Sequence, residues 1–97
     1  MLFCVNKQKI LSLLSVSRVL VIIVTYNGMK WLSRCLGSVP EWASLYVWDN
    51  DSSDGSADFV ADNYPGATII RNQDNAGFAK PNNEGFRHAL EHGFDYV

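Results

Sequence analysis

Three segments of this sequence carry side chains whose types and spacing could do chemistry. The first is Asp49-Asn50-Asp51, which places two carboxylates close together in the chain, a pair that suits Mg²⁺ or Mn²⁺. Asp and Ser also stabilise turns and helix starts, so a capped loop is a second interpretation. A carboxylate at the end of a strand can instead accept hydrogen bonds from a base N–H or from ribose hydroxyls. We favour this third interpretation for Asp49.

The second segment is Asn75–Lys80, a loop that enters a helix. The free backbone N–H groups and the positive dipole end of a helix suit a diphosphate. Lys80 could add a positive charge there. A plain loop and helix cap, with Lys80 in solvent, explains the same residues equally well.

The third segment is His88–His92, which matches the H-x-x-E-H zinc signature of one class of metallopeptidases. The two histidines are four residues apart, and therefore share one helical face. No third protein ligand is evident in the five residues that follow. A solvated helix face is the interpretation we favour, and a zinc peptidase remains a rival hypothesis.

These segments need elements to position them, and the apolar pattern predicts alternating strands and helices. Continuous β-branched runs are typical of strands that are buried on both faces of a parallel sheet. Apolar residues at helical spacing, with Pro or Gly as stop signals, predict the helices. The predicted strands are Val19–Val24, Leu45–Trp48, Ala67–Ile70 and the beginning of a fourth at Phe94–Val97. The predicted helices carry Trp31 to Val39 before Pro40, Phe59 to Tyr64 after a cap at Asp54 or Ser56, and Pro81 to Gly93.

This order predicts an α/β fold, a parallel Rossmann-like sheet with helices on both faces. Ligands of such sheets bind at the carboxyl ends of the strands. We therefore expect the site in the loops Thr25–Gly28, Asp49–Gly55 and Asn72–Pro81.

Composition and charge exclude several classes of protein. Eight Lys and Arg against ten Asp and Glu give a net charge of −2, with no basic stripe for a nucleic-acid backbone. Two cysteines, Cys4 and Cys35, cannot make a disulfide framework, and they favour a reducing cytosol.

The two ends of the chain carry further expectations. The apolar stretch Ile10–Val24 is too short for a bilayer span and contains Arg18, so residues 1–17 are expected to form an N-terminal extension, with a signal peptide as the alternative. Val97 lies within an apolar strand, where a natural domain rarely ends. We therefore expect residues 18–97 to be the N-terminal part of a longer domain, or a truncated product.

Three motifs, Val21–Asn27, Val47–Ser56 and residues between Arg71 and Gly85, together resemble the start of a family 2 glycosyltransferase with a GT-A-type fold. The motif between Arg71 and Gly85 is of the kind seen in rhamnosyltransferase-like members. Two residues depart from the family pattern, because Trp48 and Pro81 stand where smaller residues are usual. The resemblance rests on Val21–Asn27, Val47–Ser56, Arg71-Asn72, Asn75–Ala79, Asn82-Asn83 and Gly85.

The resemblance implies a role for each loop in binding a nucleotide-diphosphate sugar. Thr25, Tyr26 and Asn27 would contact the base and ribose, with Tyr26 stacked on or lining the base. Asp49 would recognise the base, and Asp51 lies beside it in the same loop. Further along the chain, Asn75, Gly77, Phe78 and Lys80 would pass near the diphosphate and sugar.

The implied reaction is transfer of a sugar to a hydroxyl of a saccharide or lipid-linked acceptor, in cell-envelope polysaccharide synthesis. The implied cofactor of the full-length enzyme is Mg²⁺ or Mn²⁺. The residues that bind this ion, and the catalytic base of the enzyme, would follow Val97. The implied location is the cytoplasm, with peripheral membrane association left open. A non-catalytic nucleotide-binding remnant of such an enzyme is the alternative function. The chain is expected to be inactive alone.

Overall fold

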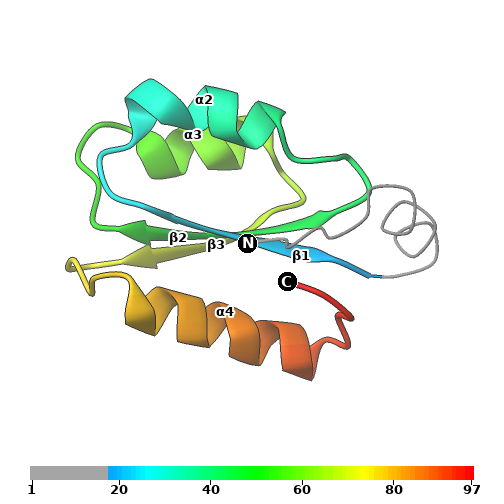
Figure 1. Ribbon diagram of the computed structural model, residues 1–97. Helices are drawn as coiled ribbons and strands as arrows, with labels where there is room; N and C mark the ends of the chain where they lie inside the picture. The colour runs from blue at the N-terminus through cyan, green and yellow to red at the C-terminus, as the bar shows by residue number, and fades with distance from the viewer. Residues whose placement is uncertain (1–17) are drawn as a thin grey trace.

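The computed structural model describes residues 18–97 and confirms the predicted alternation of strands and helices (Figure 1). The elements are β1 (Leu20–Thr25), α2 (Met29–Gly37), β2 (Ser44–Asn50), α3 (Ser56–Asn63), β3 (Thr68–Asn72) and α4 (Ala79–Glu91). The predicted extension at residues 1–17, and with it the signal-peptide alternative, lies outside the described residues. Within residues 18–97, no helix is long and apolar enough to cross a bilayer.

The three strands form one parallel sheet in the order β1-β2-β3. Figure 1 shows α2 and α3 on one face of this sheet and α4 on the other. The predicted α/β class, with a parallel Rossmann-like sheet and helices on both faces, is therefore confirmed. The β-branched runs of the strands suit this arrangement, because helices cover both faces of the sheet.

Successive side chains of the central strand β2 point to opposite faces of the sheet. Leu45 and Val47 pack with α2 and α3, whereas Tyr46 and Trp48 pack on the α4 side. The same alternation carries on through the polar end of the strand. Asp49 therefore lies on the α2–α3 face, and the next residue, Asn50, lies on the α4 face.

Several element boundaries differ from the prediction. β2 and β3 extend two residues further, to Asn50 and Asn72, because their backbones continue in parallel register with the neighbouring strand. Helix α4 begins at Ala79, so Pro81 stands in its first turn, where its missing N–H is not needed. The predicted fourth strand is present only as one parallel bridge between Tyr96 and Val19.

A close contact between α4 and β1 fixes this helix against the sheet. Gly85 of α4 is buried, and a Cβ at this position would lie 2.6 Å from Cδ1 of Ile22. The missing side chain thus lets α4 approach the sheet closely.

Candidate functional site

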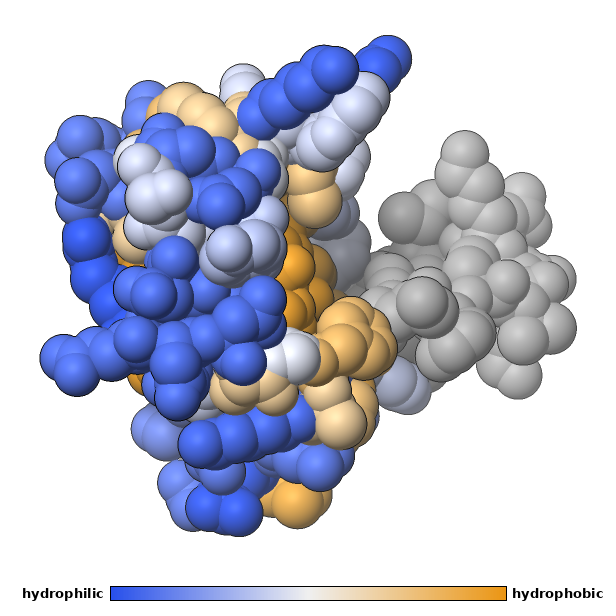
Figure 2. Space-filling view, turned by 90° about the vertical axis from the view of Figure 1, so that its left-hand side faces the viewer, coloured by the Kyte–Doolittle hydropathy of each residue, from blue (hydrophilic) through white to orange (hydrophobic). Residues whose placement is uncertain are grey.

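The three predicted loops lie together at the edge where the strands end (Figure 1). Figure 2 faces this edge and shows mostly hydrophilic residues, with hydrophobic surface in a seam between them. Parallel strands bring their carboxyl ends to one edge, so loops that are far apart in sequence become neighbours there. Hydrogen bonds between the loops hold this arrangement.

Asn27 joins the β1–α2 loop to the β2–α3 loop. Its backbone N–H donates to Oγ of Ser52 at 2.8 Å, and its Oδ1 accepts the N–H of Ser53 at 2.8 Å. Its backbone has a φ of 48°, a left-handed conformation that Asn tolerates better than most residues. The predicted ligand Asn27 thus also has a structural role, because it fixes one loop on the other.

Asp54 forms a second link between the same loops. Its Oδ2 accepts the backbone N–H of Met29 at 3.0 Å, and its Oδ1 accepts the N–H of Ser56 at 3.0 Å and the Ser56 hydroxyl. The Ser56 hydroxyl bond, followed by the Met29 bond, lowers the pKa of the Asp54 carboxyl below its ordinary value. The sequence predicted Asp54 as a cap of one helix only. In the structure its carboxylate accepts a backbone N–H at the start of α2 and another at the start of α3.

Asp49 is the buried acid of the site, with only 3% of its surface exposed. Its Oδ2 accepts the N–H of Ser52 at 3.0 Å. Its Oδ1 is buried and has no hydrogen-bond partner within residues 18–97. Desolvating a carboxylate oxygen without a partner is costly, so this atom is an acceptor that lacks its donor.

Thr25 lies beside Asp49, because the two residues are paired in the register of β1 and β2. Thr25 is buried, and a Cβ on Gly28 would come within 2.5 Å of its Oγ1. The glycine therefore makes room for the threonine hydroxyl next to the buried acid.

Asn50 connects the third loop to the sheet from the opposite face. Its Oδ1 accepts the indole N–H of Trp48 at 2.9 Å and the backbone N–H of Ala76 at 3.1 Å. Its Nδ2 donates to the carbonyl of Gly77 at 2.8 Å. Trp48, a departure from the family pattern, thus helps to orient the side chain that holds this loop.

The other predicted residues are exposed around these buried groups. Tyr26 is 55% exposed and Phe78 is 73% exposed, so both rings are open to a ligand. Asp51 is exposed and has a left-handed backbone with a φ of 63°. Asn75 accepts the N–H of Gly77 at 2.9 Å and so shapes the turn before α4.

The nine predicted site residues fall into two groups, five in the first two loops and four in the third loop. Thr25, Tyr26, Asn27, Asp49 and Asp51 belong to the two loops that Asn27 and Asp54 join. The segment with Asn75, Gly77, Phe78 and Lys80 is held by Asn50, on the other face from Asp49. Within residues 18–97, the Lys80 side chain makes no hydrogen bond or ion pair with the protein.

His88 of α4 is half-buried against Tyr46 of β2, with ring centroids 5.1 Å apart, whereas His92 is exposed at the end of the helix, so the predicted solvated helix face holds for His92 only. The two histidine rings stack with centroids 4.0 Å apart, and Nδ1 of His92 lies 2.8 Å from the carbonyl of His88. Burial, followed by the charge of His92, lowers the pKa of His88. In the part of the chain that the structure describes, no three His, Cys, Asp or Glu side chains converge as metal ligands.

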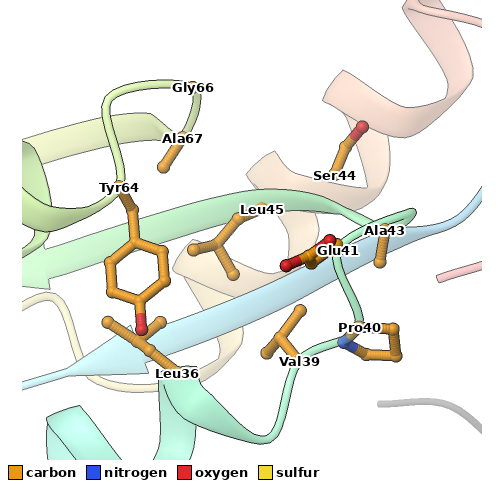
Figure 3. A pocket seen from close by; sticks show the side chains of 10 residues that line it. All are labelled: Leu36, Val39, Pro40, Glu41, Ala43, Ser44, Leu45, Tyr64, Gly66 and Ala67. Atoms are coloured by element: carbon orange, nitrogen blue, oxygen red, sulfur yellow. The ribbon is translucent and has the colours of Figure 1, made fainter.

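A cavity of about 330 Å³ lies at the opposite edge of the sheet, where the strands begin (Figure 3). It is larger than the hollow of about 250 Å³ beside Thr25 and Tyr26, but most of the side chains that line it are apolar. The polar exceptions are Glu41, Ser44 and the hydroxyl of Tyr64. By volume alone this cavity would be the better candidate for a binding site. The buried polar side chains lie instead at the carboxyl edge, which is why we place the candidate site there.

Comparison with protein families matches residues 20–93 to the model described as Glycosyl transferase family 2. The chain belongs to glycosyl transferase family 2. The search of curated proteins and the search of solved structures each found no match. The matched segment runs from the first residue of β1 to just beyond α4, so it contains all three loops of the candidate site.

Membership of glycosyl transferase family 2 confirms the broader part of the resemblance. It relates the chain to enzymes that transfer a sugar from a nucleotide-sugar donor to an acceptor. It does not extend to the rhamnosyltransferase-like subgroup, which stays a prediction.

Two residues that build the site were missed in the sequence. Asn50 follows Tyr46 and Trp48 at a spacing of two, and this strand periodicity could have placed it on the buried α4 face. Ser52 meets both Asp49 and Asn27. No local signal marks this role, because Asn27 is 25 residues away in the chain.

Proposed function

We propose that this chain forms the donor-binding part of a glycosyltransferase, and that it holds the nucleoside diphosphate of a nucleotide sugar at the carboxyl edge of the sheet. The observation that carries the proposal is that Oδ1 of Asp49 is buried and has no hydrogen-bond partner among the residues that the structure describes. A base N–H or a ribose hydroxyl would supply the missing donor, and would do so only in the bound state.

The neighbours of Asp49 support this assignment. Its second oxygen is held by Ser52, so the carboxylate is oriented before a ligand arrives. The exposed ring of Tyr26 follows directly on β1 and can stack on or line a base. Because Asn27 and Asp54 fix the two loops to each other, little conformational freedom remains to be lost on binding.

The third loop is the proposed contact for the diphosphate and the sugar. In the first turn of α4, the backbone N–H groups of Ala79 and Lys80 precede the helical hydrogen-bonding pattern. These groups and the Lys80 charge favour an anion there. Asn50 holds the start of this segment at Ala76 and Gly77, while the Phe78 ring stands out toward the proposed sugar.

The wider role is proposed at the level of the family resemblance. The parent reaction would transfer the sugar to a hydroxyl of a saccharide or lipid-linked acceptor for cell-envelope polysaccharide, in the cytoplasm or at the membrane surface. A divalent cation, when bound by such an enzyme, offsets negative charge on the leaving diphosphate. The described residues do not fit a metal centre, so we assign no step of the reaction to this chain.

A non-catalytic nucleotide-binding remnant would use the same pocket residues. Binding without turnover would favour this alternative function for the chain as it stands. Turnover by the 97-residue chain would exclude it.

The test is a titration of the chain with UDP, dTDP, GDP and ADP by isothermal calorimetry, repeated with Asp49→Asn. We expect one or more of the diphosphates to bind. A hydrogen bond to a charged group contributes about 1.5–3 kcal/mol, so Asp49→Asn should weaken binding by roughly 10- to 150-fold.

Asp62→Asn is the matched control, because Asp62 is exposed near the end of α3 and far from the predicted loops in sequence. We expect this variant to bind within about twofold of the unchanged chain. Absence of binding by all four nucleotides, or equal losses in both variants, would contradict the proposal.

A further inference from the structure

The last two residues of β2 organise different halves of the proposed donor site. Asp49 lies on the α2–α3 face of the sheet and accepts the N–H of Ser52. Asn50 lies on the α4 face and holds the third loop, which is the predicted loop Asn72–Pro81. A ligand that reaches from Asp49 to this loop must therefore cross the end of the strand.

The amide of Asn50 has only one orientation that satisfies its partners. The residue is buried, and its Oδ1 accepts the indole N–H of Trp48 at 2.9 Å and the backbone N–H of Ala76 at 3.1 Å. Its Nδ2 donates to the Gly77 carbonyl at 2.8 Å. A flipped amide would set its NH2 group against two donors and its oxygen against a carbonyl. The indole N–H thus helps to determine where the third loop lies.

Trp48 connects this amide to the hydrophobic core. Only 5% of Trp48 is exposed, and the residue belongs to the same buried cluster as Leu20 and Tyr46. Packing of the ring fixes the position of its N–H, and the bond to Asn50 transmits that position to the loop. The smaller residues that are usual at position 48 in the family pattern would supply no indole donor. This connection is therefore a feature of this chain.

We propose that Trp48 and Asn50 are positioning residues for the diphosphate of the donor, and that recognition of the base does not depend on them. This inference rests on the proposed function, in which the third loop contacts the diphosphate and Asp49 contacts the base. Because Ser52 orients Asp49 on the opposite face, loss of the indole donor leaves the base contact in place. A loop that is less well fixed loses more conformational freedom on binding, and so it binds the diphosphate more weakly.

The test uses Trp48→Phe, which keeps an aromatic ring in the core and removes the indole N–H. Tyr46→Phe is the matched control, since Tyr46 is a buried aromatic residue on the same face of β2 and its hydroxyl forms no hydrogen bond within residues 18–97. UDP, dTDP, GDP and ADP are each compared with the corresponding monophosphate by titration of amide chemical shifts. The monophosphates keep the base and the ribose but lack the second phosphate.

For every diphosphate that binds, we expect Trp48→Phe to lower its affinity relative to that of the monophosphate by about 3- to 10-fold. This ratio should stay within about twofold in Tyr46→Phe, and also in Asp49→Asn, since the lost base contact is common to both nucleotides. A ratio unchanged by Trp48→Phe, or lowered equally by Tyr46→Phe, would overturn the inference and leave the proposed function standing. Absence of binding by all four diphosphates would overturn the proposed function, and the inference with it.

A second measurement requires no substitution in the core, and it decides the question if Trp48→Phe does not fold. Hydrogen exchange of the Trp48 indole N–H is followed in the unchanged chain, and its signal is assigned with Trp31→Phe and Trp42→Phe, which replace two exposed tryptophans. We expect saturating diphosphate to slow this exchange at least about threefold more than saturating monophosphate, because the bound diphosphate holds the loop that Asn50 anchors. Equal slowing by the two nucleotides, or no slowing by either, would overturn the inference alone.

Discussion

The two ends of the sheet differ in what their loops are built from. At the carboxyl edge, Asn27, Asn50 and Asp54 tie three loops together through side-chain hydrogen bonds to backbone groups. At the amino edge, the larger cavity is lined mainly by apolar residues such as Leu36 and Leu45. A cavity between helix ends arises wherever packing is imperfect, whereas oriented polar groups at a sheet edge require specific residues. The comparison teaches that polar convergence and not volume distinguishes the candidate site.

Among the substitutions that test this comparison, we expect the largest loss of stability from Asn50→Ala. The substitution removes the acceptor of the Trp48 indole and of the Ala76 N–H, and unsatisfied buried donors cost about 1–3 kcal/mol each. We expect a loss of about 2–4 kcal/mol in the free energy of unfolding, measured by urea denaturation. Exchange of the Ala76 amide should also accelerate.

Asn63→Ala is the control for this prediction, because the Asn63 side chain donates to the Phe59 carbonyl in an exposed position at 2.9 Å. We expect it to cost no more than about 1 kcal/mol. Similar losses in the two variants would show that Asn50 does not organise the carboxyl edge.

A pair of glycines gives a direct comparison of the two edges. Gly28→Ala would bring a Cβ within 2.5 Å of Oγ1 of Thr25, whereas a Cβ on Gly66 meets nothing within 4 Å. Gly66 lines the apolar cavity at the amino edge. We expect Gly28→Ala to cost about 1–2 kcal/mol and Gly66→Ala to stay within about 0.5 kcal/mol of the unchanged chain.

Thermal melts of both glycine variants by circular dichroism are the measurement. If Gly66→Ala were the more damaging change, the amino edge would be the more tightly constrained one, and the comparison would be reversed.

A smaller effect is expected from the titration of Asp54. Its pKa is lowered in the folded chain, so it contributes stability above the ordinary carboxyl pKa of about 3.9, and this contribution is lost as the pH falls through the folded value. We expect Asp54→Asn to be less stable than the unchanged chain at pH 7, and the difference to shrink below about pH 4. Unfolding by urea from pH 7 to pH 3 measures this. A difference independent of pH would show that the carboxylate charge does not link the two helix starts.

The smallest effect is expected from filling the cavity at the amino edge. Ala43→Leu adds apolar atoms to its lining, away from the three loops. We expect nucleotide affinity to remain within about twofold, since the change lies at the other end of the strands. A loss comparable to that of Asp49→Asn, in the same calorimetric titration, would show that the two edges are coupled.

Part of the candidate site follows from local sequence. Asp49 and Asp51 come after a β-branched strand, and Asn27 comes before a turn glycine, so the parallel topology alone predicts that they share an edge. The cross-links between them do not follow, because Asn27 meets Ser52 and Ser53 only after two strands have paired.

The sequence by itself determined the kind of fold and the edge at which the candidate loops meet. Buried β-branched runs, helical stripes and stop residues act over a few positions, so their pattern specifies alternating elements and hence a parallel sheet. Only the tertiary structure decided that Asp49 keeps one oxygen without a partner within residues 18–97, and that Asn50 holds the third loop. These features depend on contacts between residues 25 or more positions apart, and such contacts exist only once the strands have set their register.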